Sequence, residues 1–151
     1  MNIASSPVQA PEQYVLLRAD DLRLLLPSTD VGPAEHFSGL LEPLDGSGLL
    51  CNPADPEGAA FYVALSSSMK PLPEAPVDRF LTTTLGDSGA SLRWCWSEVR
   101  MLASSAVTPQ PLPQALRAPY SPIAEFTVFE DHIVFFCDAA RVADFVFAHR
   151  T

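Results

Sequence analysis

Fifteen prolines divide this chain of 151 residues into short segments, and they constrain its fold more than any other feature. A proline inside a helix removes a hydrogen bond and clashes with the preceding turn, so long helices are disfavoured. The apolar runs between the prolines are short and recur roughly every ten to fifteen residues, with turn-forming residues between them. Many short strands at such spacing predict a β-sandwich or barrel rather than alternating strand–helix units.

Two stretches have the pattern of a β-hairpin. In the first, Asp20 and Asp21 separate two apolar runs and Pro27 ends the second run. In the other, residues 130–132 (EDH) separate two apolar runs near the end of the chain. Short polar breaks of this kind predict tight turns, whose carboxylates we expect to be solvated. The paired runs are residues 14–19 with 22–26, and residues 123–129 with 133–137.

The middle of the chain predicts further short strands. Leu92, Trp94 and Trp96 lie on one face of a strand because side chains alternate with a period of two. Large aromatic side chains dominate both cores and interfaces, and we expect core packing here, with a partner groove as the alternative. The remaining expected elements are strands at residues 60–65, 79–85, 92–96 and 99–103, short strands or bulges at 39–51, and a loop at 52–58.

A short helix is expected at the end of the chain. Asp138 has the position of an N-cap residue, because it precedes a segment of helical period. Val142, Phe145 and Val146 follow at the spacing of one helix face. The sequence therefore predicts an amphipathic helix over residues 139–147 that covers the core.

Composition and length indicate one packed domain. The chain is 48% apolar, far above the range of disordered proteins. Its length is that of a single domain, so we expect a flexible tail at residues 1–13 and one domain of two β subdomains at 14–151. The first residues lack the basic and apolar regions of a signal peptide, and no apolar run approaches the roughly 20 residues of a membrane span. These features predict a cytoplasmic protein without membrane insertion.

The charge balance disfavours nucleic acid as a partner. The net charge is −9, with nine basic and eighteen acidic residues, and Lys70 is the single lysine. Phosphate binding requires clustered lysine and arginine, whereas the arginines here are scattered. An anionic membrane surface is disfavoured for the same reason.

Cysteine and histidine positions match no metal or redox motif. Cys51, Cys95 and Cys137 each lie in an apolar run, 44 and 42 residues apart, and the sequence contains no C-x-x-C or H-x-x-x-H. In a reducing compartment we expect small buried hydrophobic residues, with a disulfide left open. No metal site and no cofactor are therefore predicted.

One short motif suggests catalysis. GDSGA at residues 86–90 resembles the segment around the nucleophile of chymotrypsin-like serine proteases, with Ser88 in the position of the nucleophile. That mechanism requires a histidine base oriented by a buried aspartate. His36, His132 and His149 all lie outside the sequence context of the protease family. Since Gly-Asp-Ser-Gly between two strands also suits a hairpin turn, we expect a turn and no catalytic residue.

The order of elements along residues 14–147 has a family resemblance. A hairpin ends in a Leu-Pro step, a later strand leads into an acidic turn, a Leu-Pro loop follows, and a second hairpin leads into an Asp-led helix. This order resembles the CheW-like domain, the β-rich adaptor of bacterial chemosensory arrays. The positions that match are Leu26-Pro27, Glu98-Val99, Leu112-Pro113 and Asp138.

The resemblance implies a mainly β domain of two small five-stranded SH3-like β-barrels that share a core, with a short C-terminal helix. It also implies a non-enzymatic adaptor or scaffold that docks to the cytoplasmic tip of a chemoreceptor, to a CheA-type histidine kinase, or to both. The alternative is a small β-barrel ligand-binding protein or enzyme unrelated to chemotaxis. A deep pocket with converging polar groups would favour that alternative.

The sequence departs from the family at its Asn-Leu-Arg-Gly signature. The best counterpart is Pro43-Leu44-Asp45-Gly46, in which proline replaces asparagine and aspartate replaces arginine. Arginine donates five hydrogen bonds and carries positive charge, whereas aspartate accepts and is negative. Leu44, Asp45 and Gly46 are the expected partner-binding residues, and the exchange predicts altered or lost coupling.

Overall fold

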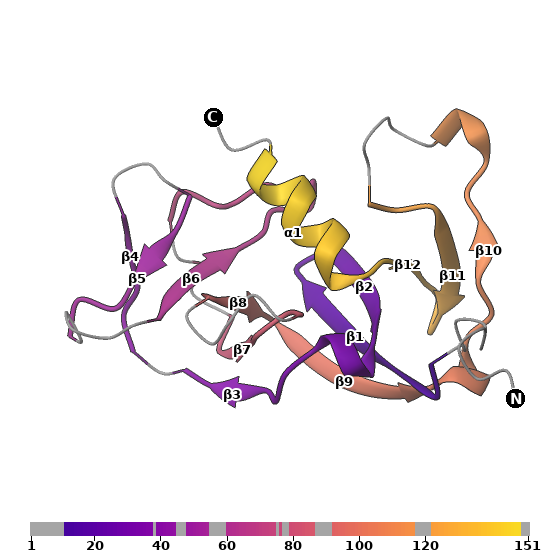
Figure 1. Cartoon of the computed structure of the whole chain (residues 1–151), viewed down its shortest axis with the longest axis horizontal. Coiled ribbons are helices and arrows are strands. Elements are labelled where there is room, and N and C mark those ends of the chain that lie inside the picture. The colour runs from indigo at the N-terminus through magenta and orange to yellow at the C-terminus, as the bar shows by residue number, and fades with distance from the viewer. Residues whose placement is uncertain are drawn as a thin grey trace, which may run out of the picture.

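The computed structural model describes residues 11–37, 39–44, 48–54, 60–74, 76, 79–86, 92–116 and 122–148. These residues form two mixed six-stranded sheets and one α-helix, α1 (Ala139–Ala148). Figure 1 shows the two sheets side by side, with α1 across their junction. The expected tail lies outside the described residues up to residue 10, and the first strand begins at Gln13.

One sheet, called the terminal sheet here, draws its strands from both ends of the chain; the other, called the middle sheet, draws them from between. The terminal sheet has the order β10 (Gln110–Pro111), β11 (Glu125–Phe129), β12 (His132–Phe136), β2 (Leu22–Pro27), β1 (Gln13–Ala19), β9 (Glu98–Ala103). The middle sheet has the order β3 (Glu35–His36), β7 (Leu81–Thr83), β8 (Leu92–Trp96), β6 (Phe61–Ala64), β5 (Leu50–Cys51), β4 (Glu42–Pro43). The pairs β2–β12 and β6–β8 are parallel.

The β1–β2 hairpin is buried on both faces. Leu17 and Leu24 belong to the core between the two sheets, whereas Leu16 and Leu25 point to the opposite side of the terminal sheet. All four leucines are almost completely buried. A strand that reads as a continuous apolar run must be covered on both sides, and the rest of the chain supplies the two covers.

The core shared by the two sheets also includes α1. Trp94 and Trp96 of the middle sheet pack there with Val142 and Val146 of α1. The Trp96 indole N–H donates to Thr83 Oγ1 at 2.9 Å, so its polar edge has a partner inside the core. The expected core role of both tryptophans is confirmed, since only 1% of Trp94 and 0% of Trp96 is exposed.

The two tryptophans provide a direct spectroscopic test of this core. We expect blue-shifted emission and weak quenching by iodide in the folded protein, because iodide does not reach a buried indole. Unfolding in guanidinium should move the emission to longer wavelength and increase the quenching several-fold. Strong quenching of the folded protein would place at least one indole at the surface and contradict the shared core.

Both hairpins and the helix are confirmed, with adjusted bounds. The turn residues Asp20, Glu130 and Asp131 have positive φ values of 55°, 50° and 66°, as tight hairpin turns require. His132 lies in β12 rather than in the turn. Asp138 Oδ1 accepts the Arg141 backbone N–H at 2.9 Å, so Asp138 is the N-cap of α1.

Several expected strands are shorter than their apolar runs. The strand expected at residues 79–85 is reduced to β7, and that expected at 123–129 begins at Glu125. Gly86, at the start of the expected 86–89 turn, has a φ of +64°; residues 87–89 lie outside the described part of the chain. Within the described ranges, no helix is long and apolar enough to cross a membrane.

The sheets are not the closed five-stranded barrels that the resemblance implies. Among the described residues, neither sheet has its first and last strands paired with each other. The short strands β4 and β10 at the sheet ends contain Pro43 and Pro111, and proline cannot donate to a strand ladder. The terminal sheet instead curls around a second apolar cluster, and side chains of Arg100 and Glu130 bridge its open side.

A buried arginine links the two sheets. The side chain of Arg79, just before β7, is 0% exposed, and its Nη1 donates to the Leu65 carbonyl at 2.6 Å. Its Nη2 donates to Asp20 Oδ2 at 2.8 Å, and Asp20 lies in the β1–β2 turn of the other sheet. Asp20 is therefore not the solvated turn charge that the sequence suggested, although its side chain is 55% exposed.

Replacing Asp20 with asparagine tests this link. Asp20→Asn keeps the shape of the turn but leaves the Arg79 cation buried without its counter-ion. We expect a loss of about 1–3 kcal/mol in the free energy of unfolding, measured by urea denaturation. The control is Asp21→Asn in the same turn, whose carboxylate has no partner among the described residues and whose effect should stay within about 0.5 kcal/mol. Equal losses in the free energy of unfolding for the two variants would contradict the role of the Arg79–Asp20 ion pair as a link between the sheets.

Candidate functional site

A groove of about 550 Å³ lies where the two sheets meet α1. Its walls come from the segment after β2, the segment after β7 and the first turns of α1. Three short stretches that are far apart in the sequence thus form one surface. The lining residues are Asp30, Leu85, Gly86, Asp138, Ala139, Ala140 and Ala143.

Backbone and carboxylate hydrogen bonds hold the three walls together. The Gly86 N–H donates to the Asp30 carbonyl at 2.7 Å, and Asp30 Oδ2 accepts the Ala139 N–H at 3.0 Å. Gly86 has a φ of +64°, and an added Cβ would lie 3.2 Å from the Cβ of Ala139. Because side chains rarely adopt this φ and have little room here, glycine suits this wall better than any other residue.

The chemistry of the groove is that of a contact surface. Its two carboxylates are engaged, since Asp30 accepts from α1 and Asp138 binds the backbone and Nε of Arg141. The other lining residues are apolar and mostly small. Among the residues that the structure describes, no histidine, cysteine or serine lines the groove. Small side chains let another backbone approach closely, so the groove suits a packed segment better than a reacting substrate.

Two smaller hollows lie elsewhere. A hollow of about 230 Å³ is lined partly by Tyr14, Phe136 and Arg141, and one of about 210 Å³ partly by Phe37 and Phe80. Burial, followed by the charge of Glu125, raises the pKa of Tyr14 above its ordinary value. Neither hollow joins both sheets to the helix.

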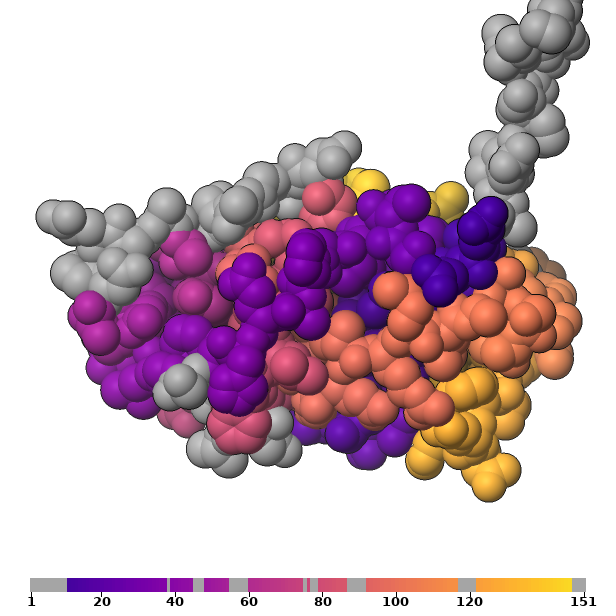
Figure 2. Space-filling model, turned by 90° about the horizontal axis from the view of Figure 1, so that it is seen from below, coloured from indigo at the N-terminus to yellow at the C-terminus, as the bar shows by residue number. Residues whose placement is uncertain are grey.

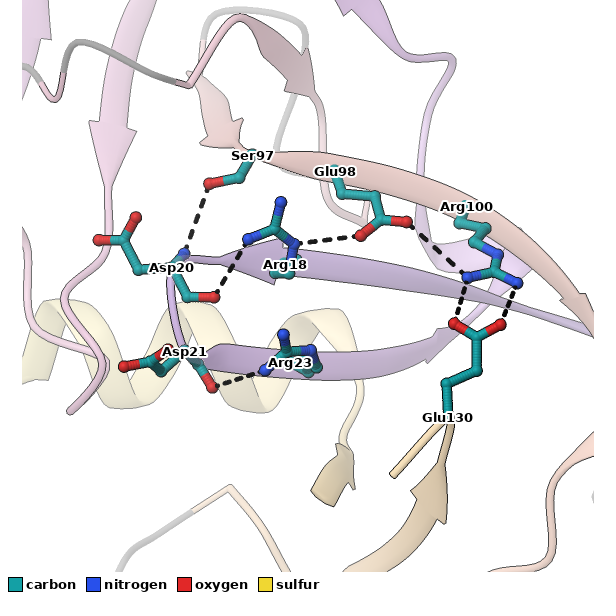
Figure 3. Close-up of polar contacts among 8 residues, drawn as sticks. All are labelled: Arg18, Asp20, Asp21, Arg23, Ser97, Glu98, Arg100 and Glu130. Atoms are coloured by element: carbon teal, nitrogen blue, oxygen red, sulfur yellow. Dashed lines mark hydrogen bonds and ion pairs between the residues drawn. The ribbon is translucent and has the colours of Figure 1, made fainter. Parts of the chain in front are cut away.

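A ladder of ion pairs runs along the open side of the terminal sheet (Figure 3). Arg18 Nε lies 3.1 Å from Glu98, and Glu98 lies 3.9 Å from Arg100. Arg100 donates two hydrogen bonds to Glu130, at 2.7 and 2.8 Å. The Arg100 hydrogen bond lowers the pKa of Glu130 below its ordinary value of 4.5, and the same bond raises the pKa of Arg100. These charges satisfy one another, so the ladder reads as a structural brace.

The pKa of Glu130 predicts how the brace responds to acid. A carboxyl group whose pKa is lowered by folding stabilises the folded state above its unfolded pKa and loses this effect as the pH falls through its folded pKa. Wild type should therefore be more stable than Glu130→Gln at neutral pH. The difference should begin to shrink as the pH falls below about 4.3, the pKa of an unfolded glutamate, and should be lost as the pH passes the lower pKa of Glu130 in the folded protein.

Thermal unfolding of both proteins between pH 3 and 7 measures this difference. Glu42→Gln, a change of an exposed glutamate in β4, is the control and should show no such pH-dependent gap. A gap between wild type and Glu130→Gln that is as large at pH 3 as at pH 7 would contradict the ionic origin of the brace.

The cysteines and histidines form no reactive cluster in the described part of the chain. Cys51, Cys95 and Cys137 are free thiols, so the possible disulfide is not formed. Burial raises the pKa of Cys95 to about 11 and also raises the pKa of Cys137, which makes both poor nucleophiles. Among the described residues, no three histidine, cysteine or acidic side chains could hold a metal ion. Ser88 and His149 lie outside the described ranges.

Of the three partner-binding residues expected from the sequence, Leu44 is the one that the structure describes, and it lies apart from the groove. Leu44 is half-buried, and its N–H donates to the Leu49 carbonyl at 2.9 Å in the connection from β4 to β5. Leu44 does not line the groove, and β4 is the last strand of the middle sheet. Asp45 and Gly46 lie outside the described residues.

Sequence reasoning missed most of the groove. Asp138 was expected as a helix cap and Gly86 as part of a turn, but nothing in the sequence placed them together. Asp30 and Leu85 carry no local signal, because their role depends on contact with α1. The turn expected from Gly86 onward was the one sequence signal that pointed to a residue of the groove.

Comparison with known proteins gives no match for this chain, either to a protein-family model or to a curated protein. These two comparisons therefore assign neither a family nor a function to the chain.

Proposed function

We propose that this chain is a non-enzymatic adaptor of the CheW-like kind in a bacterial chemosensory pathway, acting in the cytoplasm and without a cofactor. The order of hairpins, Leu-Pro steps and Asp-led helix supports the resemblance. The arrangement of two sheets around one core, with a short helix over their junction, is compatible with two subdomains that share a core. The groove at that junction is the observation that carries the proposal.

The partner is a helical segment of a chemoreceptor cytoplasmic tip or a segment of a CheA-type kinase. Helix-in-groove recognition lays an apolar helix face into an apolar groove. The small side chains of Ala139, Ala140 and Ala143 allow the close approach that such packing needs. Asp138 is already paired with Arg141, whereas Asp30 forms no ion pair among the described residues, so Asp30 favours a partner with a basic residue beside its apolar face.

The exchange of Asn-Leu-Arg-Gly for Pro43-Leu44-Asp45-Gly46 gives this adaptor altered or lost coupling to one of its partners. This segment begins at the end of β4, the last strand of the middle sheet, so a partner bound there would make a contact separate from the groove. The alternative function, a ligand-binding protein or enzyme, receives little support from the groove lining. Its polar groups are already bound to the protein itself.

Blocking the groove tests the proposal. Ala140→Trp fills the groove from an exposed position of α1, and Asp144→Trp is an equally bulky change at another exposed position of the same helix. Against a receptor cytoplasmic fragment or a CheA-type kinase, measured by calorimetry, Ala140→Trp should weaken binding at least about tenfold. Asp144→Trp should change the affinity by less than about twofold.

Two results would contradict the proposal. If folded wild-type protein binds neither partner, the proposed adaptor function is wrong. If Ala140→Trp and Asp144→Trp lose affinity equally, the partner does not bind in the groove.

A further inference from the structure

The outer edge of the terminal sheet is unprotected at β9. Among the described residues, β9 pairs with β1 alone, and it is a full-length strand of six residues. Strands at sheet edges are usually protected by proline, by outward charges or by a covering element. In Figure 2, the salmon-coloured part of the chain that contains β9 lies at the surface.

The hydrogen-bond pattern identifies which backbone groups of β9 are free. The two-residue turn makes Ala19 and Leu22 a hydrogen-bonded pair, so the odd residues of β1 bond to β2 and the even residues bond to β9. The Ser104 N–H donates to the Glu12 carbonyl at 3.0 Å, in agreement with this alternation. The even residues of β9 therefore face β1, and the odd residues direct their N–H and C=O groups outward.

The outward groups belong to Val99, Met101 and Ala103. None of these residues is charged or a proline, and Met101, at the centre, is 56% exposed. We propose that two copies of this chain associate by antiparallel pairing of their β9 strands around a two-fold axis at Met101. This association is independent of the docking groove, which lies at the junction with α1.

The register around Met101 is self-complementary. Val99 of one copy lies opposite Ala103 of the other, and Met101 lies opposite its counterpart, each pair exchanging two hydrogen bonds. Arg100 lies opposite Leu102, so no like charges meet directly. A two-fold contact of this kind uses the same surface on both copies, as most dimers do.

The charges beside this edge are already neutralised within each copy. Glu98 lies against Arg18 and Arg100, and Arg100 is bound to Glu130 (Figure 3). The net charge of −9 opposes association. Salt screens this repulsion beyond about 8–10 Å at physiological ionic strength. The contacts between the two β9 strands therefore decide whether the copies associate.

Sedimentation velocity over a concentration series tests the pairing. The wild-type mass should rise from 16.3 kDa toward twice that value. Met101→Lys places a charge at the centre of the edge, and Met101→Pro removes an outward N–H without removing one that bonds to β1. Each should raise the concentration needed for dimers at least about tenfold. Val128→Lys, a change at a similarly exposed apolar residue of β11, should leave it within about twofold.

Cross-linking tests the register. Cα atoms of a hydrogen-bonded antiparallel pair lie about 5.5 Å apart, within the range of a disulfide. Met101→Cys should therefore form a disulfide-linked dimer under mild oxidation, whereas Val128→Cys should stay at the wild-type level. Circular dichroism confirms folding of each variant, and Met101→Lys carries the test if Met101→Pro does not fold.

Three results would overturn the proposal. Wild-type protein that stays monomeric over the whole series would exclude the dimer. Val128→Lys weakening association as strongly as Met101→Lys would place the contact elsewhere. An added β-strand peptide that binds at β9 while the chain alone stays monomeric would assign the edge to a different partner.

Discussion

Burial of the β1–β2 hairpin on both faces determines how the rest of the chain is arranged. Leu17 and Leu24 need cover on one side, and Leu16 and Leu25 need it on the other. Truncating a buried leucine to alanine typically costs 2–5 kcal/mol, so neither side can be left open to water. The curled remainder of the terminal sheet covers one face, and the middle sheet with α1 covers the other. For this reason strands from both ends of the chain lie beside the hairpin.

The groove is a consequence of that arrangement. The two sheets share a core but continue in different directions, and α1 covers the seam between them (Figure 1). Asp30 fixes the seam by accepting from α1 with its side chain and from Gly86 with its carbonyl. Ser97, the single residue between β8 and β9, carries the chain from the middle sheet to the terminal sheet, and its N–H donates to the Arg18 carbonyl. These hydrogen bonds hold the walls of the groove together.

Features that depend on neighbours in the sequence were predicted correctly. The two hairpin turns, the Asp138 cap and the shared face of Trp94 and Trp96 all follow from local spacing. Features that depend on distant residues were not. Arg79 was expected as an ordinary strand residue, yet it is buried against Asp20, 59 positions away. Neither the ion-pair ladder, nor the groove, nor the open edges of the sheets have a sequence signal, because each needs strand order and curvature to be known.

The proline positions explain why closed barrels were the wrong expectation. Apolar runs and turns give the number and order of strands, but closure depends on whether the last strands can pair. Pro43 lies in β4, at one end of the middle sheet, and Pro111 lies in β10, at one end of the terminal sheet. Each proline removes a backbone N–H that could donate to a neighbouring strand. The unpaired edge at β9 and the brace from Arg100 to Glu130 both follow from this lack of closure.

Backbone NMR during titration with a helical chemoreceptor cytoplasmic fragment tests most directly whether the seam between the sheets is where a partner docks. The largest amide shift changes should gather at Leu85, Gly86 and residues 139–143, with small changes at the connection between β4 and β5. Changes centred on another surface, or none at a saturating concentration of the fragment, would contradict the account.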